Sequence, residues 1–207
     1  MQFHNMALGL PKAHLTNLKI CEGCILGKMP QHPFPRRQTT SSQPLQLVHG
    51  DLCGPFPTKS ISGSVYFISF INDYSKFTVI TLLKTKNQAL SAFKNYLHLA
   101  ENLTNHKLKS LQTDGGGEYH SKEFINFCKS EGIHHRRFVP HAPQQNGTTE
   151  RKNRSLLNVA RNMLHAVKLE SKFWEEAIAT ACYIQNRIYH HSLGNKGIRI
   201  SDEGSVV

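Results

Sequence analysis

Residues 64–83 run Ser64-Val-Tyr-Phe-Ile-Ser-Phe-Ile71, then Asn72-Asp-Tyr-Ser75 and, after one lysine, Phe77-Thr-Val-Ile-Thr-Leu-Leu83. The two outer runs are rich in β-branched and aromatic side chains, which suit a pleated strand. The polar tetrapeptide between them contains residues that favour turns. Two such runs joined by a short polar segment predict a β-hairpin.

The segments on either side of this hairpin predict a larger sheet. Before it, Leu45-Gln-Leu-Val-His-Gly-Asp51 is typical of a strand that ends at a Gly/Pro turn. After it, the pattern predicts a helix over 87–103, a strand over 107–113, a helix from Ser121 (its N-cap) to Gly132, a strand over 133–139, a long helix from Thr148 and a last helix over 171–190. This order predicts an α/β fold, with a mixed five-stranded sheet and helices on both faces.

The composition favours a polyanionic partner. The chain has 207 residues, enough for one buried core and an appendage, and it carries a net charge of +11 with a pI near 9.6. The longest apolar stretch, residues 65–71, is too short to cross a bilayer, and no signal sequence opens the chain, so we expect no membrane role. Five cysteines, an odd count without a secretion signal, indicate a reducing compartment.

Local composition also divides the chain. Residues 31–44 are rich in Pro, Gln, Ser, Thr and Arg, which is typical of a linker. We therefore expect a short segment around a Cys-x-x-Cys pair over 1–30, a folded core over 45–192 and a separate tail over 193–207.

Three acidic residues stand at informative places in the predicted elements. Asp51 ends the first strand, Asp114 follows the fourth, and Glu150 opens the long helix, so their carboxylates could meet at one edge of the sheet. Carboxylates gathered from distant points of a chain hold hard divalent cations, and two such ions can clamp both oxygens of an in-line phosphoryl displacement. Taken singly, each acid could instead be a turn residue or a favourable charge at a helix start.

The strings around these acids make a family recognisable. They are His49-Gly-Asp-Leu-Cys-Gly-Pro55, Ile71-Asn-Asp-Tyr-Ser75, Leu111-Gln-Thr-Asp-Gly-Gly-Gly-Glu118, Pro143-Gln-Gln-Asn-Gly147 and Glu150-Arg-Lys-Asn-Arg154, preceded by Gly9-Leu-Pro11 and Cys21-Glu-Gly-Cys-Ile-Leu-Gly-Lys28. In this order the chain resembles the integrase of copia-type LTR retrotransposons over about residues 6–195. More broadly, it resembles the retroviral integrase superfamily with its ribonuclease-H-like core.

This resemblance implies a function and a site. Asp51, Asp114 and Glu150 match the family's catalytic triad, which binds Mg²⁺ or Mn²⁺, with two ions per site. The implied enzyme is a polynucleotidyl transferase with nucleotidyltransferase and endonuclease activities. It processes the 3′ ends of the transposable element and joins them to target DNA, in the nucleus. The resemblance also implies a homo-oligomer when the protein is complete.

The long helix combines this acid with basic side chains. From His134 to Lys168 there are seven Lys or Arg residues and one acid, Glu150. At helical spacing, Arg154, Asn158, Arg161 and Lys168 share the face of Glu150, while Leu156, Ala160, Met163, Leu164 and Val167 form an opposite, core-facing stripe. We interpret the basic face as a phosphate-binding surface, with Arg154 as the best candidate. Asn153 matches an asparagine of the family string. The alternative is a solvated helix face.

The loop before this helix, His141 to Gly147, is polar. The resemblance implies a mobile active-site loop in which Gln145 and Asn146 contact the DNA end, and the alternative is a plain surface connection. Thr148-Thr149 departs from the small apolar pair of the family, and we predict that it caps the helix.

Cys21 and Cys24 form half of a zinc site, because a structural zinc ion needs four ligands. The family supplies two closely spaced histidines upstream, and neither His4 nor His14 has that placement. We therefore expect a truncated segment with two free thiols rather than a Zn²⁺ site. The remaining cysteines, Cys53, Cys128 and Cys182, are expected in the core or in strands.

The sequence is consistent with three alternative functions. The first is a DNA strand-transfer enzyme, the second a non-catalytic nucleic-acid-binding remnant of the integrase core, and the third a ribonuclease-H-type hydrolase. The Gln-Gln-Asn-Gly loop and the basic helix disfavour the hydrolase. The tail after Lys196 also departs from the family, so we expect a fragment whose core folds and binds ions but has weak or no complete integration activity.

Overall fold

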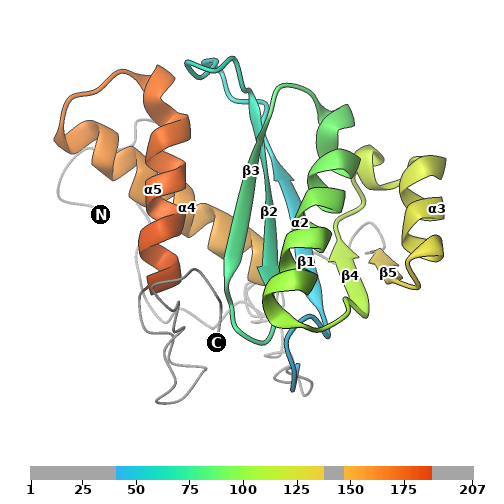
Figure 1. Cartoon of the computed structure of the whole chain (residues 1–207). Coiled ribbons are helices and arrows are strands. Elements are labelled where there is room, and N and C mark those ends of the chain that lie inside the picture. The colour runs from blue at the N-terminus through green and yellow to red at the C-terminus, as the bar shows by residue number, and fades with distance from the viewer. Residues whose placement is uncertain (1–40, 138–146, 188–207) are drawn as a thin grey trace, which may run out of the picture. The chain divides into compact units, whose positions relative to one another are not determined.

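The computed structural model describes residues 41–137 and 147–187 (Figure 1). Within these residues the strands form a five-stranded sheet in the order β3-β2-β1-β4-β5. The strands are β1 (Val48–Cys53), β2 (Tyr66–Asn72), β3 (Thr78–Leu83), β4 (Ser110–Thr113) and β5 (His134–Arg137). β1 pairs antiparallel with β2, and β2 with β3, whereas β1–β4 and β4–β5 are parallel. The predicted hairpin and mixed sheet are therefore confirmed.

The helices follow one another and the strands in the order that the sequence pattern predicts. They are α2 (Ala89–Thr104), α3 (Lys122–Ser130), α4 (Gly147–Ala166) and α5 (Trp174–Arg187), with short 3-10 turns η1 (Lys86–Gln88), η2 (Gly117–Tyr119) and η4 (Ser171–Phe173). The hydroxyl oxygen of Ser121 accepts a hydrogen bond from the backbone N–H of Phe124, which confirms Ser121 as the N-cap of α3.

Both faces of the sheet are covered by helices. On one face, Val48, Ile68 and Phe70 belong to a buried cluster with residues of α2 and α3. On the other face, Phe67 packs in a second cluster with Leu156 of α4 and with residues of α5. Because neighbouring residues of a strand point to opposite faces, the consecutive pair Phe67 and Ile68 supplies one side chain to each cluster.

α5 is attached to the sheet by polar contacts as well as apolar ones. Asn186 accepts from the backbone N–H of Thr78 at 2.9 Å and donates to its carbonyl at 2.7 Å. Thr78 begins β3, which is an edge strand of the sheet, so the Asn186 side chain satisfies backbone groups at this edge. At the other end of α5, the indole N–H of Trp174 donates to the carbonyl of Thr58 at 3.0 Å.

The turn after β1 depends on a glycine. Gly54 has a φ of +126°, and a Cβ placed there would lie 2.6 Å from the carbonyl oxygen of Val65. A side chain would therefore clash with backbone in addition to the strain of a positive φ. This turn confirms the end that the Gly/Pro pair predicts for the first strand.

Three details of the sequence prediction are wrong. The first strand begins at Val48 rather than Leu45, because Leu45 adopts a left-handed φ of +55° that interrupts an extended chain. Thr148 and Thr149 lie inside α4 and are not its N-cap, and the hydroxyl of Thr149 is buried without a partner. α4 ends at Ala166, so Val167, which is 64% exposed, is not part of the core stripe. Lys168, with a φ of +54°, likewise lies outside the helix.

Several predictions concern other parts of the chain. The segment with Cys21 and Cys24, the linker up to Thr40, the loop with Gln145 and Asn146, and the tail over 193–207 all lie outside the described residues. Of the described cysteines, Cys128 and Cys182 are buried, and Cys53 is half-buried in β1, as predicted. No helix among the described residues is long and apolar enough to cross a membrane.

Candidate active site

Asp51 lies near the end of the central strand β1, and it faces α4. Its Oδ2 accepts a hydrogen bond of 2.7 Å from the side-chain amide of Asn153, which is 3% exposed. Burial raises the pKa of Asp51 to about 6, and the nearby negative charge of Asp114 adds to this rise. The hydrogen bond from Asn153 acts in the opposite direction, because it stabilises the ionised carboxylate.

Asp114 reaches Asp51 through the parallel pairing of β1 with β4. Gly50 is the register partner of Thr113, so the residues that follow each of them stand beside each other at the same end of the two strands. The carboxylate of Asp114 accepts a hydrogen bond from the backbone N–H of Gly116 at 3.2 Å, which bends the chain directly after β4. Asp51 and Asp114 therefore repel each other across a short gap, as two unneutralised carboxylates do.

Glu150 approaches from the first turn of α4. Its Oε1 lies 2.6 Å from Nη2 of Arg154, one turn further along the helix, and both side chains are more than half exposed. Asp51 and Glu150 line one cavity of about 240 Å³ together with Asn153, Arg154, Asn158 and Arg161. Across residues 41–137 and 147–187, however, no three acidic, histidine or cysteine side chains converge closely enough to hold a metal ion by themselves.

The local chemistry fits a divalent cation. The donors are carboxylate oxygens, the ligands that Mg²⁺ and Mn²⁺ prefer. Two buried polar atoms beside them lack a hydrogen-bond partner, the amide oxygen of Asn153 and the hydroxyl of Tyr119. Buried polar groups are almost always satisfied, so these atoms indicate room for ordered water or for the shell of an ion.

Residues 41–143 match the family model described as integrase core domain. The chain belongs to this family. The resemblance to integrases that the motifs predict is therefore confirmed, and it covers the strands that carry Asp51 and Asp114.

The integrase core is also similar to two plant transposon proteins. It is 42% identical over 172 residues to the retrovirus-related Pol polyprotein from transposon TNT 1-94 of Nicotiana tabacum, covering 83% of this chain and 13% of that protein. It is 29% identical over 168 residues to the corresponding polyprotein from transposon RE2 of Arabidopsis thaliana, covering 81% of this chain and 11% of that one. The chain thus spans only about a tenth of the length of these relatives.

Solved structures share the fold of the integrase core. A chain of the simian T-cell lymphotropic virus intasome in complex with the PP2A regulatory subunit B56 gamma matches with a TM-score of 0.60 and 24% identity, over 81% of this chain and 58% of that one. The HTLV-2 integrase catalytic core domain in complex with magnesium, in its trimeric form, matches with a TM-score of 0.52 and 18% identity, over 80% of this chain and 95% of that one. These likenesses confirm the ribonuclease-H-like architecture.

The basic face of α4 forms in part as the sequence predicts. Arg154, Asn158 and Arg161 line the cavity that also holds Glu150, so they share one face of the helix. Lys152 is not among the residues that line this cavity, and burial lowers its pKa. The basic face of α4 therefore contains fewer basic side chains than the count of Lys and Arg residues in the sequence suggests.

A buried polar network beside the site is absent from the sequence prediction. Oδ1 of Asp73 lies 3.0 Å from Nε2 of His49 and 3.0 Å from Nζ of Lys76. Its Oδ2 accepts hydrogen bonds from the backbone N–H and the hydroxyl of Ser41. In the sequence, Asp73 has the signature of an ordinary turn residue. Its partner His49 stands two positions before Asp51, and only the structure shows that this histidine is fully buried.

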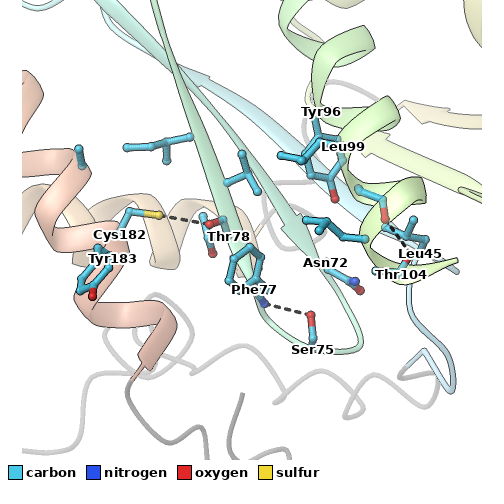
Figure 2. A pocket seen from close by; sticks show the side chains of 15 residues that line it. Leu45, Asn72, Ser75, Phe77, Thr78, Tyr96, Leu99, Thr104, Cys182 and Tyr183 are labelled. Carbon is cyan, nitrogen blue, oxygen red and sulfur yellow. Dashed lines mark hydrogen bonds between the residues drawn. The ribbon is translucent and has the colours of Figure 1, made fainter. Parts of the chain in front are cut away.

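A second cavity, of about 320 Å³, lies on another part of the core, between α2, β3 and α5 (Figure 2). Its lining is mainly apolar and includes Val79, Ile80, Tyr96, Leu99 and Tyr183. Among the described residues that line it there is no carboxylate and no histidine. The thiol of Cys182 donates to the carbonyl of Thr78 at 3.2 Å, so it is held in the wall. This cavity has none of the groups that phosphoryl transfer needs.

Proposed function

We propose that this integrase core catalyses divalent-metal-dependent phosphoryl transfer on DNA, comprising 3′-end processing and strand transfer. The observation that carries the proposal is the meeting of Asp51 and Asp114 beside a cavity whose other wall is the Glu150 face of α4. The family supports the reaction class, and a solved relative that contains magnesium supports the choice of ion.

Each acidic residue has a distinct part in this proposal. Asp51 and Asp114 bind Mg²⁺ or Mn²⁺ from the sheet, and Glu150 completes the set from the helix. Bound ions of this kind activate the attacking oxygen and stabilise the leaving oxygen. Asn153 positions Asp51, because its amide holds one carboxylate oxygen.

Arg154 contributes to DNA binding, and it controls whether Glu150 is held in an ion pair. An exposed ion pair on one helix contributes little stability, so its exchange for another partner costs little. When a DNA phosphate binds Arg154, Glu150 is released toward the cavity that it already borders. Arg161, Asn153, Gln145 and Asn146 are the further DNA contacts that we propose.

The biological setting follows as part of the same proposal. The partners are the ends of the element and the target DNA, in the nucleus, and the active form is a homo-oligomer. The intasome among the solved relatives supports an assembly on DNA, and the net charge of +11 supports a polyanionic partner.

A strand-transfer assay tests this function. The purified chain is incubated with a labelled DNA end, a target duplex and Mg²⁺ or Mn²⁺. We expect weak joining of the single labelled end, with products that vanish with Asp114→Asn and persist with Glu170→Gln, an exposed acid outside the site. Products that survive Asp51→Asn and Asp114→Asn would rule the proposal out.

A non-catalytic, DNA-binding remnant is the second candidate. It is favoured by the pairing of Glu150 with Arg154 and by the lack of a three-acid cluster among the described residues. This candidate predicts salt-sensitive DNA binding with neither nicking nor joining in either metal. Metal-dependent nicking that requires Asp114 would exclude it.

A further inference from the structure

Glu118 is an acidic residue of this site that the triad does not include. It lies in η2, four residues after Asp114, and is half-buried. A Cβ placed on Gly116 would lie 2.4 Å from Oε1 of Glu118 and 3.1 Å from Oδ1 of Asp114. Both carboxylates therefore lie against Gly116, and they fit there because this residue has no side chain.

The charge beside Gly116 is not balanced by any ion pair among the described residues. In the part of the chain that the structure describes, no Lys, Arg or His forms an ion pair with Asp51, Asp114 or Glu118. Asp114 stands beside Asp51 through the register of β1 with β4, so the carboxylate of Glu118 adjoins the pair at the centre of the site. A cation is the partner that three neighbouring carboxylates lack.

Two polar atoms without hydrogen-bond partners indicate that such a cation would carry bound water molecules. Tyr119 is 0% exposed and its hydroxyl has no hydrogen-bond partner, although it lies in the field of the same three acids. The amide oxygen of Asn153, a side chain 3% exposed, is also unpartnered, while the amide nitrogen binds Asp51. A phenol that can donate and an amide oxygen that can accept are suitable partners for water molecules around an ion.

We propose that Glu118 is a further metal-binding residue, which holds a divalent cation at Asp51 and Asp114 through the water bound to that cation. The inference rests on the proposed function. Binding through water is consistent with the distances, because no three described acids converge as direct ligands. Mg²⁺ commonly uses one or two carboxylates and keeps several waters. Groups that hold the outer shell of a metal typically contribute about 10–100-fold in affinity.

The test measures Mn²⁺ binding by the full 207-residue chain, from the electron paramagnetic resonance signal of free Mn²⁺. We expect Glu118→Gln to weaken Mn²⁺ binding by about tenfold, at the lower end of the range for outer-shell groups. The matched control is Glu123→Gln, which removes one negative charge from an exposed position in the first turn of α3 and should leave affinity unchanged. Glu118→Asp keeps the charge and should retain most of the affinity, which separates metal binding from a structural role. Thermal melting of each variant checks that it folds.

The outcomes separate this inference from the function on which it rests. If Asp51→Asn and Asp114→Asn weaken Mn²⁺ binding but Glu118→Gln behaves like Glu123→Gln, the role of Glu118 is disproved and the metal-dependent function stands. If Mn²⁺ binds equally well to the Asp51→Asn, Asp114→Asn and wild-type chains, both proposals fall.

Discussion

At the scale of single residues, Asp73 shows how hydrogen bonding overcomes burial. Burial by itself raises the pKa of a carboxyl group, but the hydrogen bonds from His49 and Lys76 hold the pKa of Asp73 well below its usual range. Asp73 is only 3% exposed, so its ionised form depends on these partners. The network joins the end of β2 to β1, the strand that carries Asp51.

The substitution Asp73→Asn tests this network. A depressed carboxyl pKa stabilises the fold above the unfolded-state value near 3.9, and this contribution is lost as the pH falls below it. We expect Asp73→Asn to lower the free energy of unfolding by about 1–3 kcal/mol at pH 7. The difference should narrow as the pH falls below about 4. Urea denaturation at pH 7 and at a pH below about 4 measures the difference in the free energy of unfolding, with Glu170→Gln as the exposed control. An equal loss at every pH would contradict the electrostatic origin.

Residue-level prediction from sequence succeeded where a string is distinctive and failed where contacts are distant. Asp51 and Asp114 stand in recognisable motifs, and the structure brings them together. The pairing of Glu150 with Arg154 was missed, although their spacing of four residues is the one at which opposite charges meet on a helix. Glu118 stands in a quoted motif, but nothing local distinguishes it from a solvated turn residue.

At the scale of elements, α4 connects the basic face to the sheet. Its buried side is anchored by Leu156 and Ala160, which pack with Phe67 of β2. The predicted stripe is correct for these two residues and for the partly buried Met163 and Leu164, because periodicity reports which face is apolar. Periodicity does not report where a helix stops, and the stop after Ala166 leaves Val167 in solvent.

Truncating Leu156 should loosen α4 from the sheet. Leu156 is 0% exposed, so Leu156→Ala leaves a cavity and should lower the free energy of unfolding by about 2–5 kcal/mol. Val167→Ala, at the exposed position just after the helix, is the control and should change little. Chemical denaturation followed by circular dichroism measures both. A small loss for Leu156→Ala would show that α4 is held mainly by its polar contacts.

The basic face of the same helix makes a prediction about salt. Neutralising a phosphate releases counterions, so Arg154→Ala should weaken DNA binding and reduce the salt slope by about one. Arg161→Ala should act in the same direction. Lys172→Ala, in η4 and outside the cavity lining, is the matched control. Binding isotherms over a series of salt concentrations measure this. An unchanged salt slope of DNA binding for Arg154→Ala would show that this face is solvated and does not bind phosphate.

At the scale of the whole molecule, residues 45–192 are predicted to fold without the segment before them. The two buried clusters are formed by side chains from residues 45–182, on both faces of the sheet. We expect a fragment of 45–192 to unfold cooperatively, because it keeps both clusters, at a temperature somewhat below that of the full chain, because it loses the hydrogen bonds from Ser41 to Asp73. Differential scanning calorimetry of the two proteins tests this. A fragment without a cooperative transition would show that the flanking segments are needed.

The first 44 residues are predicted to bind no stoichiometric zinc. Cys21 and Cys24 supply two of the four ligands that a structural site needs, and zinc sites in small domains contribute their folding energy directly. Elemental analysis of the purified full chain measures the zinc content. One equivalent of zinc that is lost with His4→Ala or His14→Ala would contradict this prediction.

The position of β1 between an antiparallel and a parallel neighbour has one more consequence. Six residues of β1 are matched to β2 and three to β4, so its alignment is fixed by two independent ladders. A slip of one residue would turn Asp51 toward the α2 and α3 side and carry it away from Asn153. A change of register would have to break the hydrogen bonds to β2 and to β4 at the same time. The two ladders together therefore keep the Asp51 carboxylate on the α4 side of the sheet. Insertions and deletions within β1 should therefore not be tolerated.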